Sequence, residues 1–306
     1  SEADTFAGVA IASDDTVYTA GFRNLAAPRL GLPPFPGSGD IFLASYSNIA
    51  NQLISLDEET VSPGAISSGA DVAIAPDDTP VVGGAAVSVG ITGASSRTIL
   101  ANLVSGNLQT FSGDFDNVPS QSAVTSLAID GSGNIYLTGV TNATLNTSNL
   151  DDPLTNGDAF IAKYDASGTE LWFETLDSGG SDTARRLAID AAGNVYVVGQ
   201  TDGTMPGQTS KGGVDAFIAK YSTTGNRVWL KQVGTAALDE AQSVAVDNAG
   251  NVYVTGETEG SLFGNNLGGS DAFVVKYTAA GREVVSTQIG TASNDETYGI
   301  TVDADQ

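Results

Sequence analysis

The sequence predicts an all-β protein: a β-propeller of four-stranded antiparallel blades, with about five blades and an orphan strand at the C-terminus. Three observations lead to this prediction: an internal repeat of roughly 58 residues, four short strand patterns in each repeat, and strands that are apolar on both faces. A repeated sheet that needs neighbours on both faces is typical of a propeller blade. We expect one domain, residues 1–306, with units at 4–66, 67–121, 122–181, 182–238 and 239–294 and a partial unit at 295–306.

The repeat is clearest in VAVDNAGNVYVTGET and LAIDAAGNVYVVGQT, and LAIDGSGNIYLTGVT is a slightly altered copy. The copies begin at Val9, Val72, Leu127, Leu187, Val244 and Ile300. The steps between these starts are 63, 55, 60, 57 and 56 residues, so one structural unit recurs along the chain.

Within the fifth unit, strands are predicted at residues 243–247, 251–256, 272–277 and 283–289. Asp247 and Gly250 suit the first turn, because an Asp carboxylate caps a turn and Gly accepts a positive φ. The first two units place Asp15 and Asp78 at the glycine position, where Asp tolerates the left-handed region better than most residues. Each unit is therefore predicted to be an antiparallel meander.

The run from Gly212 to Thr258, GGVDAFIAKYSTTGNRVWLKQVGTAALDEAQSVAVDNAGNVYVTGET, resembles the bacterial β-propeller repeat family abbreviated SBBP. The resemblance rests on the Asp-Ala-Phe and Ala-Lys-Tyr pattern, the Trp of the fourth strand and the Gly-Asn-Val-Tyr strand. It covers units three to five strongly and units one and two loosely. It implies a propeller that is commonly part of a large secreted or surface protein of bacteria, and it implies no defined activity.

After five complete units the chain repeats the first strand once more, at residues 297–303. Three interpretations are open: a fragment of a larger propeller, a five-bladed ring with a redundant end, or a protomer whose open end pairs with another chain. An unpaired strand edge is a template for another chain. The assembly edge would then consist of Thr297, Tyr298, Ile300 and Val302.

Acidic residues recur at the predicted strand entrances, at the end of each unit that carries the longer loops. The first strands are preceded by Asp4, Asp182, Asp239 and Asp295, and the third strands by Asp40, Asp158, Asp215 and Asp271. Gathered carboxylates could bind Ca²⁺, which takes six to eight oxygen ligands; the candidate ligands are Asp182, Asp239, Asp295, Asp215 and Asp271. The alternative is that each Asp accepts backbone N–H bonds at a strand entrance.

Variable loops join the second and third strands, and they are the natural recognition surface of such a scaffold. The candidates for ligand contact are Phe35, in a Pro-rich loop, and Asn265 and Asn266, which could hydrogen-bond carbohydrate. Packing of the Pro-rich loop over a blade edge is the alternative for Phe35. Among the repeated cations, Lys220 is expected to be solvated or to bridge blades rather than to act as a catalytic amine.

The composition restricts the chemistry further. The chain has 36 Asp and Glu, 12 Lys and Arg, and neither His nor Cys, so its net charge is −24. Ser-His-Asp triads, imidazole zinc sites, thiolate nucleophiles and disulfides are thereby excluded. The acidity argues against nucleic acid as a partner, and the lack of a long apolar run argues against membrane insertion.

We therefore expect a non-catalytic extracellular module of a bacterial surface or secreted protein. Its partners would be other protein chains or cell-surface polysaccharide, and it would form homo-oligomers or filaments through its terminal strand. A lectin-like propeller is the first alternative, and a glycoside hydrolase with paired carboxylates is the second. The acids recur across units instead of forming one unique pair, so the chain is not expected to be an enzyme. Ca²⁺ is the sole cofactor considered.

Overall fold

The computed structural model describes residues 5–24, 39–46, 53–59, 65–90, 93–104, 107–110, 123–141, 144–145, 154–155 and 157–303. These residues form strands, turns and loops without a helix, which confirms the all-β prediction. Accordingly, the described ranges hold no long apolar helix of the kind that crosses a membrane. The chain also divides into two compact units, each larger than a single repeat. The first compact unit consists of residues 1–155 with 163–171, and the second consists of residues 156–162 with 172–306.

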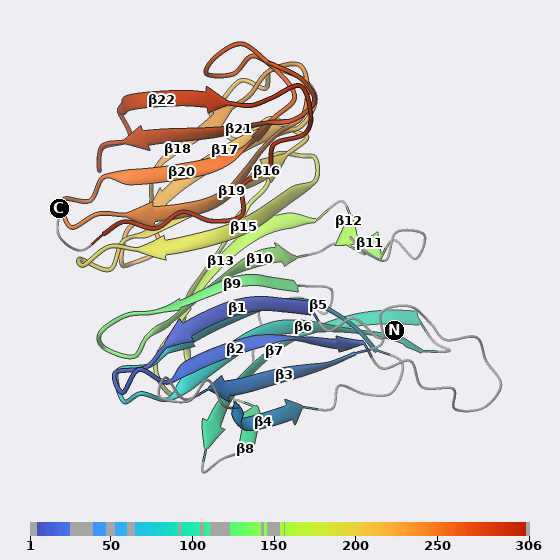
Figure 1. The fold of residues 1–306 in the computed structure, drawn as a ribbon, viewed down its shortest axis with the longest axis vertical. Helices are drawn as coiled ribbons and strands as arrows, with labels where there is room; N and C mark the ends of the chain where they lie inside the picture. The colour runs from blue at the N-terminus through green and yellow to red at the C-terminus, as the bar shows by residue number, and fades with distance from the viewer. Residues whose placement is uncertain are drawn as a thin grey trace. The chain divides into compact units, whose positions relative to one another are not determined.

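The first unit holds two complete four-stranded antiparallel sheets (Figure 1). The first sheet has the order β1 (Thr5–Ile11), β2 (Val17–Asn24), β3 (Gly39–Tyr46) and β4 (Leu53–Glu59). The second sheet has the order β5 (Ala65–Ile74), β6 (Pro80–Gly90), β7 (Gly93–Val104) and β8 (Asn107–Thr110). Each strand pairs with the next strand in sequence, as a meander requires.

The third sheet consists of β9 (Ala123–Ile129), β10 (Ile135–Thr141), β13 (Asp158–Tyr164) and β14 (Glu170–Leu176), in the order β14-β13-β10-β9. The border between the two units falls within β13 and β14. A short ribbon of β11 (Thr144–Leu145) and β12 (Leu154–Thr155) stands in the connection from β10 to β13.

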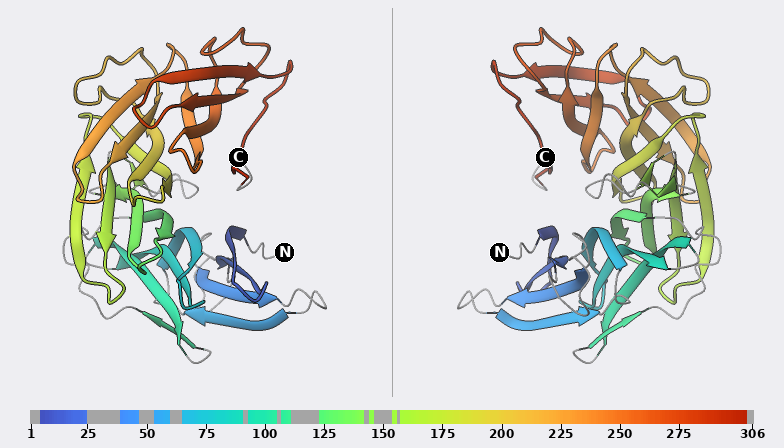
Figure 2. Two further views of the ribbon diagram at one scale, coloured as in Figure 1. Left: turned by 90° about the vertical axis from the view of Figure 1, so that its left-hand side faces the viewer. Right: turned by 90° about the vertical axis from the view of Figure 1, so that its right-hand side faces the viewer.

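The second unit holds the fourth and fifth sheets, which Figure 2 shows from two sides. The fourth sheet is β15 (Asp182–Ile189), β16 (Val195–Thr201), β17 (Asp215–Tyr221) and β18 (Arg227–Val233). The fifth sheet is β19 (Asp239–Val246), β20 (Val252–Thr258), β21 (Asp271–Tyr277) and β22 (Glu283–Ile289). The predicted third and fourth strands of the fifth unit therefore agree with β21 and β22 to within one residue.

The core of the second unit lies between the fourth and fifth sheets. Tyr196, Val198 and Ile218 project from the fourth sheet and are buried against the fifth. Val254 and Phe273 meet them from β20 and β21. Face-to-face burial of successive four-stranded sheets is the packing of propeller blades, so the fold class predicted from the repeat is confirmed.

The turn chemistry is also confirmed. Asp247 Oδ1 accepts hydrogen bonds from the backbone N of residues 249 and 251, at 3.0 and 2.8 Å, and Gly250 has φ 77°. Asp15 and Asp78 each have φ 64°, at the positions where the later units have Gly. Asp tolerates this left-handed conformation better than most residues.

Two features of the first strands differ from the prediction. β19 begins at Asp239 instead of residue 243, because a bulge between Ala241 and Ser243 lets the ladder continue to the pair Asp239–Thr258. The described residues 290–303 form no strand, although a first strand was expected at residues 297–303. In the fifth sheet the first strand is held by hydrogen bonds to the second, and residues 297–303 have no such partner strand within the described ranges.

Candidate functional site

The fifth sheet begins at an aspartate that holds the preceding loop. Asp239 is fully buried, and its backbone N donates to Val214 O at 2.8 Å. Its Oδ2 accepts Thr235 N at 2.6 Å and Thr235 Oγ1 at 2.9 Å, and Thr258 Oγ1 donates to its Oδ1. Burial raises the pKa of Asp239, and the charge of Asp215 adds to this shift. These bonds agree with the alternative to metal binding, in which the aspartate accepts backbone N–H bonds at the strand entrance.

Asp295 has the same arrangement in the segment after the fifth sheet. Its backbone N donates to Ser270 O at 2.7 Å, and its Oδ2 accepts Thr291 N at 2.6 Å and Thr291 Oγ1 at 2.8 Å. A carboxylate that accepts bonds from the residue four positions earlier fixes the turn between the blades.

Asp215 and Asp271 begin β17 and β21 and are fully buried. Asp215 Oδ2 accepts Lys211 N at 3.0 Å and Gln232 Nε2 at 2.7 Å. Asp271 Oδ2 is bound in the same way, with Gln288 Nε2 at 2.9 Å. Both carboxylates therefore bind one loop amide and one glutamine side chain.

The two glutamines are functional positions that sequence reasoning missed. Gln232 Nε2 also donates to Gly203 O at 2.9 Å, and its Oε1 accepts Met205 N at 2.8 Å. Gln288 Nε2 likewise donates to Gly260 O at 2.9 Å. The loops before the third strands are thus tied to the outermost strands. The available signal was the shared position of the glutamines, one residue before the ends of β18 and β22.

Two glycines make room for these aspartates. A Cβ on Gly234 would lie 1.9 Å from Asp215 Oδ1, and a Cβ on Gly290 would lie 1.9 Å from Asp271 Oδ1. Neither oxygen accepts a hydrogen bond. The buried Oδ1 of each aspartate therefore lies directly against the glycine backbone, and any larger residue at the glycine position requires a different arrangement of the carboxylate.

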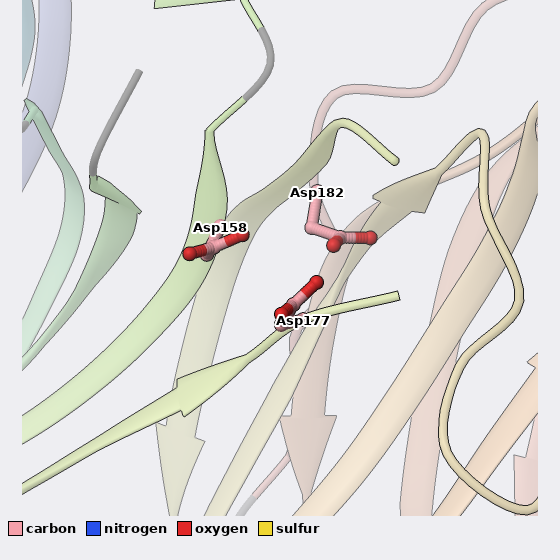
Figure 3. A group of neighbouring side chains, drawn as sticks. All are labelled: Asp158, Asp177 and Asp182. Carbon is pink, nitrogen blue, oxygen red and sulfur yellow. The ribbon is translucent and has the colours of Figure 1, made fainter. Parts of the chain in front are cut away.

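The third sheet has such a larger residue. Asp177 stands where the next two units have Gly234 and Gly290, directly after the last residue of β14 and in the loop before the next blade. Asp158, Asp177 and Asp182 each offer one carboxylate oxygen, and these oxygens lie within 4.8 Å of one another. Figure 3 shows the three carboxylates turned toward one another, from β13, the loop after β14 and the start of β15.

Asp182 differs from its counterpart Asp239 at Oδ1. It is fully buried and its Oδ2 accepts Ser178 N at 2.8 Å, but its Oδ1 accepts no hydrogen bond. Thr201 Oγ1 donates to Ser178 Oγ instead, at 2.9 Å. Burial raises the pKa of Asp182, and the charge of Asp158 contributes to the shift. Within the described residues, Asp158, Asp177 and Asp182 form the group of acids close enough to share one ion. Of the five predicted calcium ligands, Asp182 alone belongs to this group.

The predicted assembly edge lies beside the fifth sheet. Thr297 Oγ1 donates to Gly256 O at 3.3 Å, and Ile300 N donates to a serine hydroxyl of β19 at 3.3 Å. Tyr298 is 80% exposed, and Val302 is partly buried. The segment therefore runs along the inner strands of the fifth sheet without entering a ladder.

One side of the fifth sheet is exposed, and we call it the open face. It consists of Tyr253, Val274, Lys276, Val285 and Ile289. Val285 is 59% exposed and Ile289 is 62% exposed. The corresponding side of the fourth sheet, with Tyr196 and Ile218, is buried under the fifth sheet. Within the described residues, no sheet covers the open face in that way.

Lys220 and Trp229 connect the fourth sheet to the fifth. Lys220 Nζ donates to Ala279 O at 3.2 Å and lies 4.8 Å from the centre of the Tyr196 ring. Trp229 Nε1 donates to the same Ala279 O at 3.1 Å. These contacts agree with the expectation that the repeated lysine bridges blades.

The predicted ligand loops are only partly described. Phe35 lies outside the described residues. Asn265 is exposed, whereas Asn266 is used within its loop: its Nδ2 donates to Gly269 O at 3.0 Å and its Oδ1 accepts Gly268 N at 3.0 Å. Contact of these residues with a ligand stays a prediction.

Comparison with known families agrees with the repeat pattern. Residues 119–145, 175–204 and 228–264 match the family model described as a beta-propeller repeat, SBBP. The resemblance read from the sequence is thereby confirmed over three repeats. Among curated proteins, the regulatory protein FlaEY of Caulobacter vibrioides is 26% identical over 165 residues, which cover 49% of this chain and 17% of FlaEY.

Solved structures share the fold at low identity. A protein of unknown function from Dyadobacter fermentans has a TM-score of 0.52 at 10% identity, over 94% of each chain. A variant of apocarotenoid oxygenase from Synechocystis has a TM-score of 0.50 at 14% identity, over 93% of this chain and 60% of the oxygenase. The expectation that this chain is not an enzyme is therefore wrong, because an enzyme has the same fold. Fold and repetition give no ground for excluding catalysis.

Proposed function

We propose that this chain is a structural and binding module of a bacterial surface or secreted protein, and that it joins a second copy of itself through the open face. The SBBP repeats support a scaffold role, since the family resemblance implies large secreted or surface proteins. The match to FlaEY, which spans 17% of that protein, supports a module within a longer architecture. A net charge of −24 is suited to a well-solvated exterior.

The open face is the observation that carries the proposal. In the fourth sheet, the Tyr196 and Ile218 side chains are 0% and 1% exposed because the fifth sheet covers them. In the fifth sheet, Val285 and Ile289 remain more than half exposed on the equivalent side. A repeat protein whose blade leaves an apolar face without a neighbour gains free energy when another blade covers that face.

The first sheet offers the complementary surface. Val9 in β1 is 65% exposed, whereas its counterparts Leu187 and Val244 are each 7% exposed. Val244 belongs to the core between the fourth and fifth sheets. The first sheet of one copy, placed on the open face of another, would repeat the packing of the fifth sheet on the fourth. Such a contact joins two different surfaces, so it is a head-to-tail association.

Light scattering of the 306-residue chain across a wide range of concentration tests this proposal. We expect oligomers whose mass rises with concentration, and we expect higher salt to favour them by screening the negative charge. Val285→Glu and, separately, Val9→Glu should reduce the mass to the monomer. Val228→Glu is the matched control, because Val228 is 55% exposed on β18 and lies outside both surfaces.

A mass of 31.0 kDa at every concentration and salt would overturn the proposal. Oligomers that survive both substitutions would also overturn it, because association would then depend on another surface. Circular dichroism of each variant checks that the sheets remain folded, so that loss of mass reports on the contact itself.

A further inference from the structure

We propose that a calcium site lies where the third sheet meets the fourth, formed by the carboxylates of Asp158 in β13, Asp177 in the loop after β14 and Asp182 at the start of β15. The three ligand oxygens lie within 4.8 Å of one another (Figure 3). Oxygens bound to one Ca²⁺ stand about 2.3–2.6 Å from the ion, so two of them on opposite sides are about 5 Å apart. The three carboxylates are therefore close enough to share a single ion.

A second observation points to a ligand at this place. Asp182 is fully buried, and its Oδ1 accepts no hydrogen bond. Its counterpart Asp239 has the donor that Asp182 lacks, because Thr258 Oγ1 donates to Asp239 Oδ1. The equivalent Thr201 hydroxyl, at the end of β16, donates to Ser178 Oγ. A buried carboxylate oxygen without a hydrogen donor is stabilised by a cation.

The third unit departs from the repeat pattern beside the same cluster of carboxylates. Gly234 and Gly290 let the carboxylates of Asp215 and Asp271 lie against the backbone. Asp177 takes the glycine position in the third unit and adds a third negative charge beside Asp158 and Asp182. Like charges at this separation repel one another, and a divalent cation reverses the sign of that interaction.

The ligand set favours calcium. All three side chains supply hard oxygen atoms, and Asp177 is exposed, so water can complete a shell of six to eight oxygens. Magnesium demands a nearly ideal octahedron at shorter distances and gives up its water reluctantly. Zinc prefers nitrogen and sulfur ligands, and this chain has neither His nor Cys.

Isothermal titration of calcium chloride into the chelator-treated 306-residue chain tests the site. We expect one equivalent of Ca²⁺ to bind, and we expect Ca²⁺ to raise the thermal midpoint. Asp177→Gly restores the residue of the two following units, so it is expected to fold and to weaken binding by about tenfold or more. Asp158→Asn should weaken binding similarly. Glu174→Gln, which removes an exposed charge from β14, the strand that precedes Asp177, should bind as the original chain does.

Absence of calcium heat in the folded original chain would overturn the proposal. So would equal binding by Asp177→Gly, because the ion would then sit elsewhere on the acidic surface. Magnesium chloride that binds as tightly as calcium chloride would refute the assignment to calcium.

Discussion

Gly234 is expected to be among the most sensitive positions of the second unit. Replacing it with Ala adds a Cβ that would lie 1.9 Å from Asp215 Oδ1, whereas real Cβ contacts essentially never fall under 3.0 Å. The carboxylate must then move by about 1 Å, since the three atoms nearest to this Cβ position all belong to Asp215. Such a shift breaks the bonds that Asp215 Oδ2 accepts from Lys211 N and Gln232 Nε2.

The magnitude follows from those two bonds. A hydrogen bond to a charged group contributes about 1.5–3 kcal/mol, and a carboxylate that stays buried without its donors adds a desolvation cost. We therefore expect Gly234→Ala to lower the free energy of unfolding of the second unit by about 3–6 kcal/mol. The loop that contains Gly203 and Met205 should also be held less firmly to β18, because Gln232 binds both of these residues.

Urea unfolding followed by tryptophan fluorescence measures this effect, because both tryptophans, Trp172 and Trp229, belong to the second unit. Gly299→Ala is the matched control. No atom lies within 4 Å of a Cβ placed on Gly299, so its substitution should change the free energy of unfolding by less than about 0.5 kcal/mol. A loss below about 1 kcal/mol for Gly234→Ala would refute the reasoning, since the carboxylate would then have moved without losing its partners.

Two further predictions concern equivalent residues and acid sensitivity. Tyr196→Ala should lower the free energy of unfolding of the second unit by about 3–5 kcal/mol, and Tyr253→Ala should lower it by markedly less. Tyr196 is fully buried under the fifth sheet, whereas Tyr253 lies on the open face. Equal losses of unfolding free energy in urea would contradict this prediction. Burial opposes ionisation of Asp190, but bonds from Asn194 and Tyr196 outweigh it and hold the pKa of Asp190 below 3.8. The unfolded chain then binds the proton more tightly, so the stability that Asp190 contributes is present above about pH 3.9 and is lost as the pH falls through the folded pKa. Asp190→Asn should therefore reduce the fall of the unfolding midpoint at acid pH. A pH dependence of the midpoint equal to that of the original chain would contradict this prediction.

Much of the fold could be predicted because its determinants are local. The turn at Asp247 and Gly250 is closed by bonds within five residues, and the left-handed residues Asp15 and Asp78 occupy the same turn position. Local chemistry also explains why residues 297–303 look like a strand in the sequence. A strand nevertheless needs a paired neighbour, and pairing is a property of the assembled sheet rather than of the segment.

The site was less predictable because it depends on residues from different strands. Asp182 was recognised from its repeated position, but its two neighbours in the cluster were not selected as ligands with it. The signal for Asp177 was the change from Val-Gly-Thr to Leu-Asp-Ser at equivalent positions. Periodicity shows that such a residue is unusual, while the distance to Asp158 appears only when β13 and the loop after β14 are placed in space.

The repeated and the unique acids therefore have different physical meanings. Asp239 and Asp295 each accept the backbone N–H of the residue four positions earlier, at the same turn. A structural role of this kind can act on several units, so it explains why the residue recurs. Asp177 has no such requirement, since the following units use glycine there without loss of the blade. Its carboxylate adds a negative charge close to Asp158 and the buried Asp182, and a bound cation would offset the repulsion among the three.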